Sequence, residues 1–437
     1  EVAADVGIAS DPAIRERVDQ AIRRVLAMQD SSGGFGLWAP VGGDLWLNAY
    51  ITDFLTRARQ AGYTVPALSM SLALDNIQNT LAYSSDFQAG EGADVAYGIY
   101  VLARNGRASI GDLRYFIDER LDDFGTPLAK AQVAAAVAFS GDRQRADRAF
   151  SAAADGLPPA GRDDIPDRND FGSALRDASA SLTLTAEAAI DVRGLPALTR
   201  AMAVANETRT EGLTTQEMAW QLMAAHALGA SDGGLDLTVD GLPHGGALFR
   251  SMSVPALQRA PVRIANRGHD TAQVAVTVTG TPRLPQPAAA NGLSIERQYY
   301  SLDGERVDPR QVAQNHRMVV VLTATEVEAR LAELLISDLL PAGFEIENPA
   351  LVTSADLAAF PWLDADRLPA HLGFRDDRFI AAFSRVGNTT DPMIVAYMVR
   401  AVSPGTFAHP AAQVEDMYRA GRFARTAPGS TTVRPVR

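Results

Sequence analysis

Cysteine is missing from all 437 residues of this chain. Without a thiol, the chain cannot form a disulfide bond, a thiolate nucleophile or a cysteine-ligated zinc site. Lysine is almost missing as well, because all but one of the 40 basic residues are arginine and only Lys130 carries an amine side chain. No apolar run approaches the roughly 18 residues that a membrane-spanning helix needs.

Positive charge is also in short supply, since the net charge is -12 and the isoelectric point is about 5.0. A nucleic-acid or anionic-membrane surface normally needs a basic stripe, so neither is expected as a partner. The apolar share of 47% with 21% charged residues is that of a folded protein. Its length allows two to four domains. Because the first residue is Glu1 and not methionine, we expect a piece of a longer protein whose targeting signals lie elsewhere.

The stretch from residue 29 to 50, QDSSGGFGLWAPVGGDLWLNAY, combines glycine pairs with aromatic residues. Gly33-Gly34 and Gly42-Gly43 supply the backbone freedom for two turns. We expect the segment to fold back between them and bury a plug of apolar side chains, Phe35, Leu37 and Trp38. A hydrophobic ligand wall is the alternative role for these aromatic residues. Asp44 then suits the N-cap of the following helix.

Residues 1–230 have the apolar spacing of helices throughout. The expected helices are 14–29, 44–61, 66–83, 93–104, 110–122, 127–139, 143–154, 173–190, 196–207 and 215–228. Members rich in small residues alternate with the others, and they begin near Asp44, Ala93, Pro127, Ser173 and Thr215. Helix pairs at this spacing form either a solenoid or a closed α/α toroid. The small residues favour close inner packing, so we predict a toroid in which about ten of twelve helices are visible and the others lie upstream of Glu1.

β-structure is expected after residue 230. Strands are predicted at 235–239, 248–254, 262–266 and 273–279, followed by a Pro/Ala linker over 281–290. A second β-rich unit includes strands at 293–300, 317–324, 330–340, 378–386 and 394–401, with a short helix at 354–360. The tail from Arg425 is expected to fray. The predicted domains are 1–230, 231–285 and 286–437, an α/α toroid followed by two antiparallel β-sandwich units.

Motifs for catalysis or metal binding are weak. None of the six histidines lies three or four residues from another, and no HExxH is present. The acidic loop GRDDIPDRNDFG at 161–172 lacks EF-hand spacing, so it is interpreted as a solvated loop. No GxSxG, GxGxxG or GxxxxGK[ST] motif occurs. Arg176 and Asp177 are interpreted as a local structural pair. We therefore expect no catalytic residue, no metal and no cofactor.

Several motifs in order do carry a resemblance: GGFGLW and DLWLNAY at 33–50, DVAYGIYVLARNGR at 94–107, FGSALRDASASL at 171–182 and TTQEMAW at 214–220. Together they resemble the thioester domain of bacterial α2-macroglobulins. SDLLPAGFEIENP at 337–349 and AYMVRAVSPGTF with EDMYR at 396–419 resemble the C-terminal, receptor-binding-like macroglobulin domain of that family. The region between them lies where the family has part of a CUB-like domain.

The resemblance implies a Cys–Gln thioester in a shielded site, where exposure lets a lysine amine of an attacking protease capture the acyl group. The CxEQ motif, with the thioester Cys and Gln, is expected upstream of Glu1. Relatives that favour hydroxyl acceptors carry a histidine near residues 84–94, and SSDFQAGEGAD has none. An intact thioester would therefore prefer amines. The aromatic residues that would shield such a site are Trp38, Trp46, Tyr50 and Tyr97, for which a plain core role is the alternative.

The resemblance further implies a non-enzymatic, broad-spectrum protease inhibitor that traps proteases after bait cleavage. It implies a periplasmic protein held at the inner membrane by an N-terminal lipid, and an association with a peptidoglycan-building penicillin-binding protein. One rival is an α/α-toroid enzyme of the polyprenyl cyclase type, which shares QxxxGGF-like turns but needs a DxDD motif that this chain lacks. Another is a non-covalent periplasmic binding or scaffold module.

Overall fold

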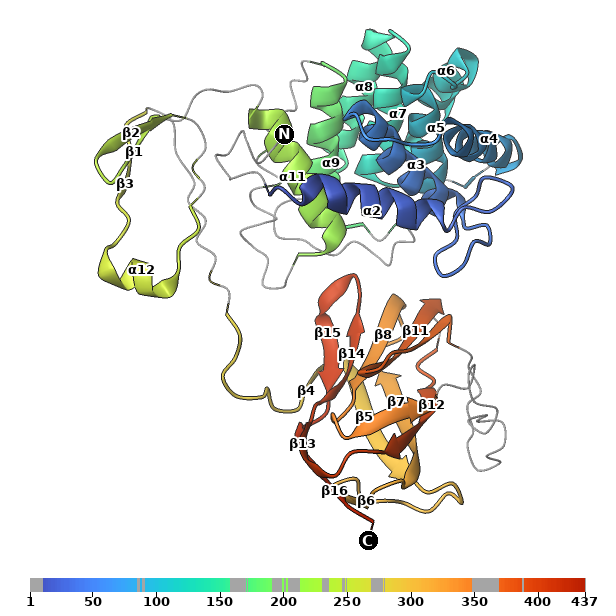
Figure 1. Ribbon diagram of the computed structural model, residues 1–437. Helices are drawn as coiled ribbons and strands as arrows, with labels where there is room; N and C mark the ends of the chain where they lie inside the picture. Colours follow the sequence, from blue (N-terminus) through green and yellow to red (C-terminus); the bar gives the residue numbers. More distant parts are fainter. Residues whose placement is uncertain are drawn as a thin grey trace. The chain divides into compact units, whose positions relative to one another are not determined.

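The computed structural model describes residues 11–84, 87–88, 91–157, 170, 172–190, 199, 202, 213–229, 236–245, 248, 250–268, 278, 280–347, 369–386 and 389–436. Contacts divide the chain into two compact units. The first is helical and also includes a small β-sheet, and the second is the β unit that begins near residue 277. Each unit is described by itself (Figure 1).

The described helices of the first unit agree closely with the predicted ones. They are α2 (Ile14–Leu26), α3 (Leu45–Gln60), α4 (Ala67–Ser84), α5 (Ala93–Arg104), α6 (Ile110–Glu119), the 3₁₀ turn η1 (Leu121–Asp123), α7 (Pro127–Phe139), α8 (Arg143–Asp155), α9 (Ala174–Glu187) and α11 (Thr215–Gly229). The helix predicted over 196–207 lies outside the described residues, except for two helical positions at 199 and 202.

The helices rich in small residues form one continuous row. α3 packs on α5, α5 on α7, α7 on α9 and α9 on α11 (Figure 1). The others cover this row, with α4 against α3 and α5, α6 against α7, and α8 against α7 and α9. Alanine makes up much of the buried part of α7, and a helix without long side chains can be approached closely from several sides. The alternation predicted from the sequence is therefore seen as helices that form the row and helices that pack against it.

The glycine-rich stretch before α3 folds back only in part. Phe35 is completely buried, and its backbone N–H donates to Oδ1 of Asn48 in α3 at 2.7 Å. The expectation that Leu37 and Trp38 are buried with it is wrong, because they remain 61% and 42% exposed. The loop after Phe35 turns outward, so a single aromatic ring plugs the turn. Asp44 caps α3 as predicted, and its side chain accepts from the Leu47 N–H.

Lys130 lies in the first turns of α7, a helix whose other residues are mostly buried. Its side chain is only 19% exposed, and its ammonium group lies 4.0 Å from a carboxylate oxygen of Asp122. Thr126 caps this helix and Pro127 occupies its first turn, where a missing N–H costs nothing. The one amine side chain of the sequence is therefore largely covered by its own unit.

The small sheet of the first unit is antiparallel, in the order β2-β1-β3. Its strands are β1 (Asp236–Val239), β2 (Leu242–Gly245) and β3 (Ile264–Asn266). The strand predicted over 248–254 is wrong, because its described residues before Val254 are not in a strand and Val254 begins the helix α12 (Val254–Arg259). Pro255 in the first turn suits a helix start. The strand predicted over 273–279 lies outside the described residues, except for residue 278.

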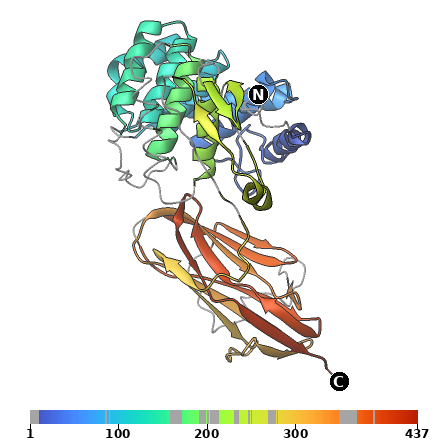
Figure 2. The same cartoon turned by 90° about the vertical axis from the view of Figure 1, so that its left-hand side faces the viewer.

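The strands of the β unit form two larger sheets and one smaller sheet (Figures 1 and 2). The six-stranded sheet has the order β10-β11-β8-β14-β15-β4, the four-stranded sheet β5-β7-β12-β9 and the three-stranded sheet β13-β16-β6. Their bounds are β4 (Ala289–Asn291), β5 (Leu293–Tyr300), β6 (Gln311–Ala313), β7 (Arg317–Glu326), β8 (Leu331–Leu339), β9 (Phe344–Glu347), β10 (His371–Phe374), β11 (Arg378–Val386), β12 (Met393–Ala401), β13 (Gly405–His409), β14 (Ala412–Asp416), β15 (Arg419–Arg425) and β16 (Gly429–Arg434). Among the described strands, β16 pairs with β6 in parallel, and the other strand pairs are antiparallel.

One hydrophobic core is shared by the six-stranded and four-stranded sheets. Alternate residues of β7, β8 and β12 enter it, for example Val320, Ile336 and Tyr397. The tail after Arg425 was predicted to fray, and this is wrong, because β16 pairs with β13 along its length. Its Val433 is 2% exposed, so burial and backbone pairing together hold the end of the chain. The helix predicted over 354–360 lies outside the described residues.

Candidate functional site

One face of α3 carries a polar and aromatic set in a regular helical spacing. Trp46, Tyr50, Asp53 and Arg57 follow one another at intervals of four, three and four residues, so they lie along the same side of the helix. α5 presents Tyr97, Tyr100 and Arg104 at intervals of three and four. Because α3 packs on α5, these two faces meet, and Glu187 at the end of α9 joins them.

The aromatic part of this site is a chain of ring contacts. Trp46 stacks on Tyr50 with centroids 5.2 Å apart and an interplanar angle of 8°. The edge of Tyr97 meets Trp46 at 6.3 Å, and Tyr97 contacts Tyr100 at 6.2 Å. Offset and edge-on contacts of this kind contribute about 0.5–1.5 kcal/mol each beyond area burial. The cluster runs from a half-exposed edge at Tyr50 to the fully buried Tyr100.

The polar part is a closed network of two guanidinium groups and two carboxylates. Arg57 donates to Asp53 at 3.0 Å, to Glu187 at 2.5 Å and to the Tyr100 hydroxyl at 2.8 Å. Arg104 donates to the same hydroxyl at 2.7 Å and to Glu187 at 2.6 Å. The Tyr97 hydroxyl donates to Asp53 at 3.1 Å. Two positive and two negative charges balance, which burial of such groups requires.

Burial and the neighbouring charges fix the protonation states of this network. Burial is the largest cause of the raised pKa values of Tyr97 and Tyr100, and the Asp53 carboxylate adds to it. Burial alone would raise the pKa of Glu187, but Arg57 and Arg104 outweigh it and the pKa is lowered. The phenols are therefore held neutral and Glu187 ionised at neutral pH. At neutral pH the phenols and Glu187 therefore hold neighbouring side chains in place and do not exchange protons.

The four predicted shielding residues separate into two groups. Trp46, Tyr50 and Tyr97 lie together in the ring chain on α3 and α5. Trp46 is half-buried, Tyr50 is 38% exposed and Tyr97 is 4% exposed. Trp38 lies in the outward-turned loop before α3. Trp46 and Tyr50 thus offer an aromatic edge at the surface, whereas Tyr97 supports them from the interior.

The charged half of this site is not among the residues predicted from the sequence. The spacing of Asp53 and Arg57 on α3, and of Tyr100 and Arg104 on α5, was available as a signal, because both pairs are four residues apart. Glu187 gave no such signal, since it lies 130 residues from Arg57 in the chain. Only the packing of α9 on α7, which itself packs on α5, brings it into range.

A second buried network surrounds Arg176, which is 1% exposed. Arg176 donates to Asp177 at 2.7 Å and to Asp170 at 2.6 Å, so the predicted local pair is confirmed and extended. Ser173 caps α9 and its hydroxyl also contacts Glu217 of α11 at 2.5 Å. This network ties α9 to α11 and to the turn before α9. The prediction of a solvated acidic loop is wrong at Asp170, which is 6% exposed because it is the partner of Arg176. The other acidic residues of that loop lie outside the described residues.

Metal and membrane features can be judged for the described part of the chain. No group of three or more histidine or carboxylate side chains there could hold a metal ion. Of the helices described, none combines the length and apolarity needed to cross a lipid bilayer. His409, the most buried histidine of this part, bonds Tyr299 and Thr431 and belongs to the β unit.

Comparison with known proteins finds sequences and structures that are similar to this chain. The bacterial alpha-2-macroglobulin MG10 domain matches residues 292–420. An alpha-2-macroglobulin of Escherichia coli K12 is 29% identical across 94% of this chain, and one of Xylella fastidiosa strain Temecula1 is 29% identical across 96% of it. The crystal structure of native Escherichia coli alpha-2-macroglobulin, from domain MG7 to the C-terminus, matches 99% of this chain with a TM-score of 0.79 and 26% identity. The chain belongs to the bacterial α2-macroglobulin family.

The match extends over nearly the whole of this chain. A Salmonella alpha-2-macroglobulin structure, of protein reacted with methylamine, also matches 99% of it, with a TM-score of 0.79 and 30% identity. This chain covers 70% of the Escherichia coli crystal chain but only 28% of the Salmonella chain. It spans about a quarter of the length of the curated relatives, 26% and 27%. An order of helices followed by antiparallel sheets is thus common to this chain and the C-terminal part of α2-macroglobulins.

Proposed function

We propose that this chain is the C-terminal part of a bacterial α2-macroglobulin that inhibits proteases by trapping them and is not itself an enzyme. The observation that carries the proposal is the match of 99% of the chain to the Salmonella protein that was reacted with methylamine. Methylamine is a small primary amine, and a lysine side chain of a protease presents the same nucleophile. The similarity therefore supports capture of amines by an acyl group in the whole protein.

The row of helices α3, α5, α7, α9 and α11 fits the inner ring of an α/α toroid, with α4, α6 and α8 on its outside. In this proposal residues 1–230 form the thioester-type domain, 231–285 the CUB-like segment and 286–437 a macroglobulin β-sandwich. Bait cleavage elsewhere in the protein would release a strained arrangement, and the β domains would pass that change to the toroid. Such coupling needs two stable packings of the same domains.

Shielding is the chemical task that the aromatic site suits. A thioester survives only where water is kept away from its carbonyl carbon. Trp46 and Tyr50 supply a rigid, partly exposed aromatic edge, and the neutral phenol of Tyr97 supports it. None of these groups is a base at neutral pH that could activate water. In a longer protein with a Cys–Gln thioester, they would therefore cover the acyl group without hydrolysing it, and Trp38 would add a further cover from its loop.

Location and a cellular partner follow the family resemblance. We place the whole protein in the periplasm, anchored to the inner membrane by a lipid outside this chain, beside a penicillin-binding protein that builds peptidoglycan. A trap at that position would protect the cell envelope from proteases that cross the outer membrane. Fractionation of cells that express the tagged full-length protein, followed by cross-linking, tests both parts.

The experiment for trapping uses the full-length protein, that is, this chain with its preceding coding sequence. Incubation with methylamine is expected to add one amine per molecule by mass spectrometry. Preincubation with trypsin is expected to protect a large protein substrate from cleavage. The isolated 437-residue chain is the control, because it lacks cysteine and should gain no amine. A full-length protein that neither gains methylamine nor inhibits would leave a scaffold role, and predominant glycerol adducts would contradict the preference for amines.

A further inference from the structure

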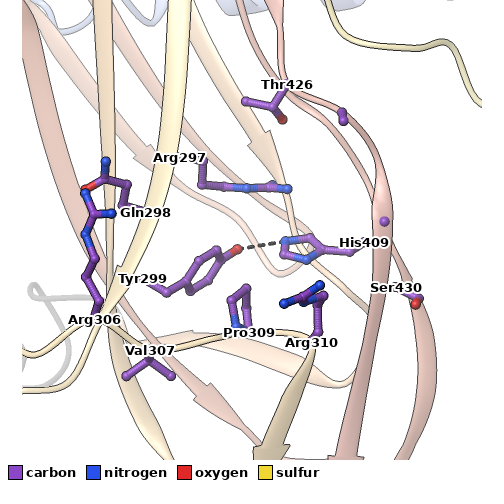
Figure 3. Close-up of a pocket in the computed structure, with 12 residues that line it drawn as sticks. Arg297, Gln298, Tyr299, Arg306, Val307, Pro309, Arg310, His409, Thr426 and Ser430 are labelled. Carbon is purple, nitrogen blue, oxygen red and sulfur yellow. Dashed lines mark hydrogen bonds between the residues drawn. The ribbon is translucent and has the colours of Figure 1, made fainter.

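The β unit contains a cavity of about 330 Å³ whose lining is positively charged. It lies between β5, the loop that follows it and the segment that leads into β16 (Figure 3). Three arginines line it, Arg297, Arg306 and Arg310, and no carboxylate side chain does. The whole chain has a net charge of -12, whereas the charged side chains that line this cavity are all positive.

Two of the three guanidinium groups retain free donors. Among the described residues, the side chain of Arg306 has no hydrogen bond or ion pair, and it is exposed. Arg310 faces Asp308 with its Nε and Nη2 atoms, at 2.9 Å and 2.8 Å, which leaves Nη1 unused. Arg297 is different, because it is held by Asp338 and by the Pro410 carbonyl. A planar guanidinium with free N–H groups matches the oxygens of a carboxylate or a phosphate.

The middle of the cavity offers an apolar surface. Figure 3 shows the Tyr299 side chain between Arg306 on one side and Arg310 on the other. The hydroxyl of Tyr299 is bonded to Nε2 of His409 at 2.7 Å, so the ring is fixed in place. Val307 and Pro309 add apolar atoms to the lining. An apolar lining of this kind suits the carbon skeleton of a small ligand.

The charge of the cavity does not depend on histidine. Burial lowers the pKa of His409 to about 3, with the Arg297 charge acting in the same direction. Both ring nitrogens are already bonded, to Tyr299 and Thr431. The other charged groups at the cavity are the arginines and the Asp308 and Asp338 carboxylates behind them. Between pH 5 and 8 the positive charge therefore comes from arginine alone.

We propose that this cavity binds a small organic oxyanion, that is, a carboxylate or phosphate on an apolar carbon skeleton. Arg306 and Arg310 bind the charged group, and the ring of Tyr299 contacts the carbon skeleton. The site goes beyond protease trapping and does not depend on it, since every residue involved lies in the β unit. A ligand there would bridge β5 and the start of β16, two segments that different sheets contribute.

The test is titration of the 437-residue chain with benzoate, phenyl phosphate, inorganic phosphate and benzyl alcohol by calorimetry. Benzoate and phenyl phosphate are expected to bind one site saturably, more weakly as salt is raised, and benzoate equally at pH 5.5 and 7.5. The two organic anions are expected to bind at least about tenfold more tightly than phosphate or benzyl alcohol. Binding of phosphate or benzyl alcohol as tight as that of the organic anions, or no saturable binding of any probe, overturns the proposal.

Variants locate the binding. R306Q with R310Q is expected to weaken phenyl phosphate binding by about tenfold or more, whereas R378Q, which removes another exposed arginine beside an aspartate, leaves it unchanged. G429L is expected to block the cavity, because a Cβ at Gly429 meets no atom within 4 Å and the residue lines the cavity. G245L, at an equally open strand glycine of the small sheet, is its control. Equal effects in the cavity and control variants overturn the assignment.

Discussion

The side-chain carbonyl of Asn48 accepts the backbone N–H of Phe35 at 2.7 Å. This bond joins the glycine-rich loop to α3, and both residues are buried. The amide group of Asn48 also donates to Asn76 of α4 at 3.0 Å. One asparagine therefore holds a loop and two helices together, and it satisfies a buried backbone donor that has no helix or strand to pair with.

Replacement of Asn48 by alanine is expected to lower the free energy of unfolding by about 1–3 kcal/mol, because the Phe35 N–H loses its acceptor inside the unit. Urea denaturation followed by circular dichroism measures the change. Q20A on the exposed side of α2 removes a side-chain amide that only meets Glu16, and it should leave stability unchanged. An N48A protein as stable as Q20A would show that the loop repacks without this bond.

Gly33 is expected to tolerate alanine less well than Gly62. Both have a positive φ, 90° and 84°, so alanine at either position costs about 1–2 kcal/mol of backbone strain. A Cβ at Gly33 would also lie 2.1 Å from the Leu72 carbonyl oxygen, whereas one at Gly62 meets nothing within 4 Å. The difference between G33A and G62A in denaturant midpoint isolates the steric part. Equal losses would mean that α4 moves away freely.

The Glu187 carboxylate is expected to make stability depend on acid pH. Its pKa in the folded state is lowered from the ordinary value of 4.5, so its contribution is present above that pH and is lost as the pH falls through the lower folded value. E187Q should cost about 1–3 kcal/mol at pH 7, because Arg57 and Arg104 lose a charged acceptor. The gap between wild type and E187Q should narrow as the pH falls below 4.5, because the pKa of Glu187 in the folded state is lower than that value. The exposed E305Q variant is the matched control, and a gap of the same size at neutral and acid pH would contradict this account.

Arg297 is expected to be essential for the β unit. It is the cation beside Asp338, whose side chain is completely buried and also accepts from Tyr397 at 2.8 Å. R297M leaves that carboxylate with no positive partner and should destabilise the unit by about 3–5 kcal/mol. R310Q, which breaks only an exposed pair, should unfold at the wild-type denaturant concentration. Similar midpoints for the two variants would show that Asp338 is neutral in the folded protein.

The proposed shielding role predicts a kinetic effect in the full-length protein. W46A should release a free thiol several-fold faster at a temperature where the protein stays folded, because water reaches the thioester more easily. Thiol reagents measure the rate. Y83A removes an aromatic side chain that is 93% exposed, and it should not change that rate. A W46A protein that melts earlier but hydrolyses no faster would assign Trp46 to the core alone.

Helix positions were predictable from local signals. The bounds of α5 and α7 agree with the predicted ranges, because apolar spacing, the Pro127 start and the glycine after α5 are all local. The plug was predicted only in part. Phe35 and Trp38 are both aromatic residues between glycine pairs, and which of them turns inward is decided by Asn48, thirteen residues away from Phe35.

The features that could not be predicted from the sequence depend on contacts between residues far apart in the chain. The end of the chain resembled a frayed tail because TAPGSTTVRPVR has few apolar residues, yet Val433 and Thr431 face inward and the backbone pairs with β13. Val254 follows LFRSMS, a run of apolar and polar residues, and the helix there begins with Pro255 in its first turn. The charged half of the aromatic site depended on Glu187, whose partners are contributed by two other helices.

The covered position of Lys130 has a consequence for any acyl-transferring reagent. With one side-chain amine in 437 residues, and that one 19% exposed beside Asp122, the chain offers almost no internal target for acylation. If the whole protein carries a reactive acyl group, this part of the chain is a poor competitor for it. A lysine amine of a protease would then compete for that acyl group with almost no side-chain amine of this chain.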